Sequence, residues 1–151
     1  MFSMKAKYAL KALLYLAKRQ DKKPTLIAEL AERESIPRKF LEAILLELKN
    51  HGILNSRKGK GGGYTLARPA ESLSIGHVIE IFDGPMMIPA CVRRSAVLNC
   101  NACDQSAACG LRLIMQQVRE AISNSLDRTM LSQVVFQTQL LDEGKELIFE
   151  I

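Results

Sequence analysis

The sequence lacks several features, and each absence excludes a class of protein. No apolar stretch approaches the roughly 18 residues that span a bilayer, so we do not expect a membrane protein. Lys11 interrupts the apolar N-terminal segment and no small-residue cleavage site follows, which favours a folded helix over a signal peptide and predicts a cytoplasmic protein. No Ser/His/Asp set, carboxylate pair or nucleotide-binding motif is present, so the sequence does not predict an enzyme.

Cysteine is absent outside one short segment, in which the four cysteines follow the pattern Cys91-x8-Cys100-x2-Cys103-x5-Cys109. Thiols stay reduced in the cytosol, so we do not expect disulfides. Clustered thiolates bind an iron–sulfur cluster or zinc, act as redox switches, or have no chemical role. Structural zinc usually takes two close cysteine pairs, and only Cys100 and Cys103 form one, so the spacing favours an iron–sulfur cluster.

Acidic residues are scarce in the first part of the chain. Residues 1–68 contain 15 Lys and Arg against 6 Asp and Glu, a net charge of +9, whereas residues 69–151 have a net charge of −4. This asymmetry predicts a polyanionic partner for the N-terminal region, and charge alone leaves nucleic acid and an anionic membrane surface as alternatives.

The hydrophobic periodicity predicts a mainly α protein of the α+β class. Three amphipathic helices are expected first, over residues 3–19, from an N-cap at Thr25 to Arg33, and from Pro37 to Asn50 with Phe40 in the apolar stripe. Strands over 53–56 and 64–67 then enclose a basic, glycine-rich tip. The remaining helices are expected at 74–82, from Leu111 onward, and from a cap at Thr129 to Val135.

The order of helix, helix, short break, helix and basic hairpin is that of a winged helix-turn-helix. A plain helical bundle and a nucleotide-phosphate loop are the alternatives, but the glycine run lacks the Gly-Lys-Ser/Thr ending of such loops. Together with the charge of +9, this order favours binding to double-stranded DNA. The helix that fits the major groove offers Pro37, Arg38, Lys39, Phe40 and Glu42, and the hairpin tip offers Lys58 and Lys60.

Three motifs resemble the Rrf2 family of bacterial winged-helix regulators, which includes the IscR-, NsrR- and CymR-like proteins. The motifs are Ile36-Pro37-x-x-Phe40-Leu41-Glu42, Leu48-x-x-x-Gly52-Ile53-Leu54 and Ser56-x-x-Gly59-x-Gly61-Gly62-Gly63-Tyr64-x-Leu66-Ala67. Lys7-Tyr8-Ala9-Leu10 and Leu126-x-x-Thr129 extend the resemblance over most of the chain. The resemblance implies a homodimeric transcriptional regulator that binds an operator, and it adds Arg57 and Gly59 to the wing contacts.

The resemblance is strongest to the cluster-binding members of the family. It implies that a 2Fe–2S or 4Fe–4S cluster is held by Cys91, Cys103 and Cys109, with Cys100 as the candidate fourth ligand. The histidine and aspartate that serve as fourth ligands in relatives are replaced here by Arg112 and Lys7. His77 and Asp104 are reserve candidates for that position.

We therefore expect a DNA-binding domain over residues 1–84, a sensor loop over 85–110, and a dimerisation helix with a tail over 111–151. An apolar seam suited to pairing with a second copy contains Leu111, Met115, Val118, Ile122 and Leu126. The hypothesis is a repressor-type regulator whose affinity for a palindromic operator depends on the cluster, which senses iron, redox state or nitric oxide. The alternatives are a cluster-free regulator controlled by thiol oxidation or a partner protein and, more remotely, an electron carrier or metalloenzyme subunit.

Overall fold

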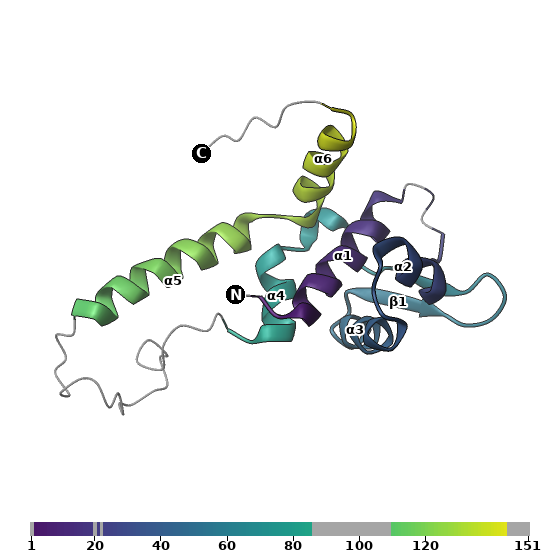
Figure 1. Ribbon diagram of the computed structural model, residues 1–151, viewed down its shortest axis with the longest axis horizontal. Helices are drawn as coiled ribbons and strands as arrows, with labels where there is room; N and C mark the ends of the chain where they lie inside the picture. Colours follow the sequence, from purple (N-terminus) through teal and green to yellow (C-terminus); the bar gives the residue numbers. More distant parts are fainter. Residues whose placement is uncertain (1, 20, 22, 86–109, 145–151) are drawn as a thin grey trace.

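The computed structural model describes residues 2–19, 21, 23–85 and 110–144. They form a body of packed helices with a β-hairpin at one side, from which one long helix extends (Figure 1). The elements are α1 Met4–Lys18, α2 Ile27–Glu34, α3 Arg38–Asn50, β1 Leu54–Arg57, β2 Gly63–Leu66, the 3₁₀ helix η1 Ala70–Ser72, α4 Ile75–Asp83, α5 Gly110–Arg128 and α6 Leu131–Asp142. This arrangement confirms the predicted winged-helix architecture of mainly α structure.

Helix α1 lies at the centre of the body and contacts α2, α3, α4 and α6. Its start is set by Ser3, whose hydroxyl accepts a hydrogen bond from the backbone N–H of Ala6 at 3.1 Å. The side chains of Ala6, Ala9 and Ala12 are completely buried. Small side chains at these positions allow the neighbouring helices to approach α1 closely, so α1 can pack against four helices at once.

Helices α2 and α3 are joined by a tight turn at Ser35, Ile36 and Pro37. Ser35 has a φ of 53°, in the left-handed region, and its N–H donates to the carbonyl of Glu32 at 3.3 Å. Ile36 is buried against the core, which fixes the end of the turn. Pro37 is the N-cap residue of α3, one position before the helix begins at Arg38, and does not lie in its first turn.

The buried side of α3 consists of Leu41, Ile44, Leu45 and Leu48, as the apolar stripe predicted. The inclusion of Phe40 in that stripe is wrong, because its side chain is 53% exposed. Phe40 lies one position before the buried row and therefore points away from the core in the first turn. Gly52, with a φ of 69°, follows the end of α3 and confirms the predicted stop.

The antiparallel hairpin pairs Leu54 with Leu66 and Arg57 with Gly63. A third segment joins it, because Thr25 and Tyr64 exchange two backbone hydrogen bonds of 3.0 and 2.9 Å. Thr25 is completely buried and does not cap α2, so that expectation is wrong. The N-cap residue is Leu26, which makes no side-chain capping bond. Long-range pairing with the hairpin has replaced local capping.

Two glycines of the hairpin tip are required by close backbone contacts. Gly62 donates to the carbonyl of Gly59 at 2.9 Å, and a Cβ added to Gly62 would lie 2.3 Å from the carbonyl oxygen of Arg57. Gly63 has a φ of 141°, and an added Cβ would lie 2.4 Å from the carbonyl oxygen of Thr25. These glycines therefore shape the wing and allow the Thr25 segment to pair with it.

The connection between α5 and α6 pairs with the start of α4. Ile75 donates to the carbonyl of Thr129 at 2.9 Å, and Leu131 donates to that of Leu73 at 2.8 Å. The predicted final helix from Thr129 to Val135 is wrong in both bounds, since α6 begins at Leu131 and ends at Asp142. The Thr129 hydroxyl donates back to the carbonyl of Ser125, so this residue closes α5 and does not cap α6.

Candidate nucleic-acid interface

The first turns of α3 present an exposed polar surface. Pro37, Arg38, Lys39, Phe40 and Glu42, the residues predicted to contact DNA, are all exposed. The helix is 13 residues long, or about 20 Å, which fits within the major groove. Because the four leucine and isoleucine side chains on the opposite side are buried, α3 can present only this face to a ligand.

Arg38 and Glu42 form an ion pair on this surface, with 3.1 Å between Nε and Oε1. Pairs of this kind on an exposed helix contribute only about 0.3 to 0.5 kcal/mol, so the pair can open when a ligand binds. Lys39 makes no ion pair among the described residues. The surface thus offers cations for phosphate or guanine, a carboxylate that accepts from cytosine N4, and the Phe40 ring for a thymine methyl group.

The hairpin tip carries the second set of predicted contacts, and Arg57, Lys58, Gly59 and Lys60 are all exposed. Its three cations have no ion-pair partner in the part of the chain that the structure describes. The tip projects away from the helical body (Figure 1), while β1 packs against α3. The structure therefore combines the two predicted contact regions in one continuous structural unit.

Helix α5 extends from the body (Figure 1), and several of its large apolar side chains are exposed. In the predicted seam Leu111, Val118 and Ile122 are 60%, 42% and 42% exposed, Met115 is half-buried, and Leu126 packs against the protomer's own core. Leu113 and Ile114, which the seam omitted, are also largely exposed. These two residues lie beside the predicted seam, so the apolar face near the start of α5 is broader than the spacing of the seam residues predicted.

The candidate ligands Cys91, Cys100, Cys103 and Cys109, together with Asp104, lie outside the described residues. Within the described ranges no three or more His, Cys, Asp and Glu side chains gather as a metal site. Lys7 on α1 and His77 on α4 are exposed, and Arg112 on α5 is half-buried. In the described ranges, moreover, no helix combines the length and apolar character that crossing a bilayer requires.

A polar network fastens α1 to α2. The Tyr15 hydroxyl donates to Glu29 Oε1 at 2.8 Å, and Arg19 Nη1 donates to the same oxygen at 2.9 Å. Burial is the main cause that raises the pKa of Tyr15, and the hydrogen bond to Glu29 raises it further. Arg19 also holds Asp21 through two hydrogen bonds, and these lower the pKa of that carboxyl. The network fixes the start of the helix-turn-helix relative to α1.

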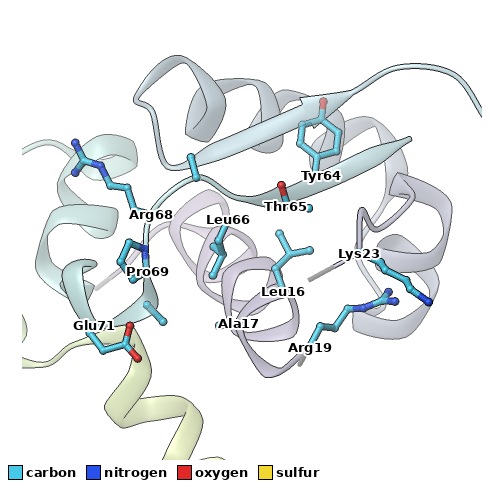
Figure 2. A pocket seen from close by; sticks show the side chains of 12 residues that line it. Leu16, Ala17, Arg19, Lys23, Tyr64, Thr65, Leu66, Arg68, Pro69 and Glu71 are labelled. Carbon is cyan, nitrogen blue, oxygen red and sulfur yellow. The ribbon is translucent and has the colours of Figure 1, made fainter. Parts of the chain in front are cut away.

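A groove that adjoins this network was not among the sites predicted from the sequence. Its volume is about 510 Å³, and it lies between the end of α1, Lys23, strand β2 and the segment leading to η1 (Figure 2). Two segments that are distant in the sequence form it, one from Leu16 to Lys23 and one from Tyr64 to Glu71, so no local motif indicates it. The lining residues are Leu16, Ala17, Arg19, Lys23, Tyr64, Thr65, Leu66, Ala67, Arg68, Pro69, Ala70 and Glu71.

Comparison with known proteins gives consistent results. Residues 2–137 match the model of the Rrf2 family, described as iron-dependent transcriptional regulators. The chain is 40% identical over 121 residues to an Rrf2-like HTH-type transcriptional regulator of Rhodobacter capsulatus, covering 78% of this chain and 81% of that protein. It is 27% identical over 138 residues to the regulator IscR of Klebsiella pneumoniae, covering 91% and 81%.

Two solved structures show the same fold. CymR, the global cysteine regulator of B. subtilis, superposes with a TM-score of 0.73 at 26% identity, covering 90% of this chain and 96% of that one. A transcriptional regulator from Listeria innocua superposes with a TM-score of 0.73 at 27% identity, covering 100% and 96%.

Proposed function

Since the chain belongs to the Rrf2 family of DNA-binding transcriptional regulators, we propose that it binds its operator as a homodimer under the control of an iron–sulfur cluster. The family members compared with it are regulators and not enzymes. In the proposal residues 1–84 bind DNA, residues 85–110 sense the signal, and residues 111–151 dimerise. The observation that carries the DNA-binding part is that every predicted contact on α3 and the wing is exposed.

Each half of the DNA-binding surface has a distinct role in this proposal. Lys39, Phe40 and Glu42 face the base edges of the major groove, while Arg57, Lys58 and Lys60 follow the adjacent minor groove and its phosphates. Gly59, with a φ of 91°, lets the wing chain turn between two cations. Arg38 contributes a further cation once its weak pair with Glu42 opens.

The DNA-binding surface is tested with a duplex selected from a random-sequence pool by the unmodified protein. Lys39→Ala and Lys58→Ala should each weaken binding, and each lost phosphate contact should reduce the slope of log affinity against log salt by about 0.9. Lys49→Ala, at the far end of α3, is the matched control. Unchanged affinity and slope in both variants would mean that the protein reads DNA with another surface.

Four thiolates suit either cluster type chemically, so Cys91, Cys103 and Cys109, with Cys100 as the fourth, can supply all the ligands. When bound, a cluster supplies a centre that reacts with oxidants and nitric oxide. Two findings support this part: the family description specifies iron dependence, and IscR is among the relatives. Cys109 directly precedes α5, whose N-terminal positive dipole end favours a thiolate at that position.

The cysteine segment connects α4 to α5, and this connection suggests how the signal is transmitted. Helix α4 packs against α1, which packs against α3, while α5 carries the proposed dimer face. Binding at the cysteines changes the connection between the DNA-binding domain and α5. It thereby changes the separation of the two recognition helices in a dimer. Affinity for two half-sites depends on that separation.

The cluster is tested by comparing anaerobically reconstituted and stripped protein. We expect visible absorption with bound iron and sulfide in the first preparation, and different affinities of the two for the selected duplex. A colourless protein without iron or sulfide would overturn the cluster. The cluster-free alternative, which the similarity to the cysteine regulator CymR supports, predicts instead that peroxide changes both the free-thiol count and DNA affinity.

A further inference from the structure

The groove of about 510 Å³ lies on the opposite side of β2 from the β1 strand and apart from the residues assigned to DNA (Figure 2). Its volume falls in the range of about 300 to 1,000 Å³ that is usual for small-molecule sites. Leu16, Ala17 and Leu66 form an apolar centre between the helix and the strand. Water in such a groove is readily displaced by an apolar ligand body.

Charge is distributed unevenly along the groove. Figure 2 shows the side chains of Arg19 and Lys23 together at one end, whereas at the other end the cation Arg68 lies on the same side as the carboxylate of Glu71. Arg19 is already held by Asp21 and Glu29. Lys23 has no ion-pair partner among the described residues, so its ammonium group is available to a ligand. An anionic group is therefore favoured at the Arg19–Lys23 end.

We propose that this groove binds a small organic carboxylate with an apolar body, whose carboxylate pairs with Lys23. The apolar body lies on Leu16, Ala17 and Leu66. The site differs from the cysteine segment and the DNA contacts, so it adds a second ligand to the proposed function.

An occupant would also touch the elements that position the wing. Strand β2 forms one wall, and Tyr64 within it is paired with Thr25 at the start of the helix-turn-helix. A ligand in the groove thus bridges the end of α1 and the wing. If the ligand binds one position of the wing more tightly than another, it shifts the population toward that position and so changes the affinity for DNA. The size of the shift is set by the difference between the two ligand affinities. This second step rests on the proposed DNA-binding function, whereas carboxylate binding does not.

The binding step is tested with octanoate as the probe and ¹⁵N-labelled full-length protein. Amide NMR signals of residues 16–19 and 64–68 should shift saturably on titration, whereas those of the wing tip at 58–60 should not. Lys23→Glu should weaken octanoate binding roughly tenfold or more. Lys60→Glu, the same charge reversal at an exposed position outside the groove, should leave it unchanged. Thermal unfolding of both variants confirms that they are folded.

The site is wrong if no saturable shift is seen, if the shifts spread over the exposed face of α5 alone, or if Lys23→Glu and Lys60→Glu weaken binding equally. If octanoate binds only to a variant ending at Gly144, residues 145–151 of the chain are the occupant and the small-molecule site is wrong. The coupling step is measured separately, as operator affinity with and without octanoate. If octanoate binds in the NMR titration but leaves operator affinity unchanged, the binding site stands and the proposed regulation is wrong.

Discussion

A single strained residue sets the turn between the two helices of the DNA-binding motif. Ser35 occupies the left-handed region at a φ of 53°, where a Cβ costs about 1 to 2 kcal/mol. The surrounding bonds hold it there, because Ile36 donates to the carbonyl of Ala31 at 2.9 Å and Lys11 donates to the carbonyl of Glu34. The strain is therefore tolerated so that α3 leaves the turn at a fixed angle.

Replacing Ser35 with glycine should stabilise the protein. Glycine removes the left-handed penalty but loses more chain entropy on folding, so the expected net gain in unfolding free energy is about 0.5 to 1 kcal/mol. Urea denaturation measures it. The control Ala43→Gly, at an exposed interior position of α3, should lower the same quantity by about 1 kcal/mol. A loss of stability in Ser35→Gly would show that the serine side chain stabilises the turn.

Tyr15 is the residue from which a pH effect is expected. Burial and its hydrogen bond to Glu29 raise its pKa above the ordinary value near 10, because the folded protein favours the neutral phenol. The stability from this group is therefore fully present below pH of about 10. It is lost as pH rises through the folded pKa, since the unfolded chain releases the proton first.

Absorbance at 295 nm measures this effect directly. The folded protein should show a late-ionising component, and Tyr15→Phe should remove it. Glu29→Gln, which keeps a hydrogen-bond acceptor and removes the charge, should move the component toward lower pH. A late component that persists in Tyr15→Phe would assign the shift to another phenol.

At the scale of elements, the junction of α4, α5 and α6 determines where the long helix points. Residues 73–75 pair with 129–131, and Asp127 lies against Gly76 in the first turn of α4. A carboxylate at this end of a helix interacts favourably with its dipole. Helix α5 is thus fixed to the body at its C-terminal end, while its other end adjoins the cysteine segment.

Gly76→Ala should disturb this junction. Its Cβ would lie 2.1 Å from Asp127 Oδ1 and 3.1 Å from the Asp127 nitrogen, so we expect a loss of about 1 to 3 kcal/mol in unfolding free energy. In an Asp127→Ala background the same change should cost less, because the carboxylate no longer occupies the space. Urea denaturation of the four proteins gives the coupling energy. Additive effects would show that Asp127 does not restrict Gly76.

The sequence predicted elements whose signals are local. The apolar rows of α1 and α3 and the glycines of the hairpin identify their elements because periodicity and positive φ are properties of a few adjacent residues. Thr25 was misassigned because its pairing with Tyr64, 39 positions away, outweighs its capping preference. The groove was missed for the same reason, since it exists only where α1, Lys23 and β2 meet.

At the scale of the whole molecule, the exposed apolar face of α5 requires a partner surface. A helix that projects from the body with Leu111, Val118 and Ile122 exposed leaves a contiguous apolar stripe in water. A second copy of α5 would cover it with an identical stripe, which gives a two-fold dimer with two equivalent recognition helices. That symmetry is what a palindromic operator requires.

Ile122→Glu should therefore separate the proposed dimer, because it places a charge in the centre of the stripe. Sedimentation should give one chain of 16.8 kDa instead of two, and operator affinity should fall roughly 100-fold or more as the two half-sites cease to be bound together. Asn124→Glu, the same charge on the polar side of α5, should remain dimeric and bind normally. Circular dichroism confirms that both variants are folded. If Ile122→Glu stayed dimeric with unchanged affinity, the two copies would have to pair through another face. The cysteine segment would then not connect the DNA-binding domain to the dimer interface, and the proposed transmission of the signal would be wrong.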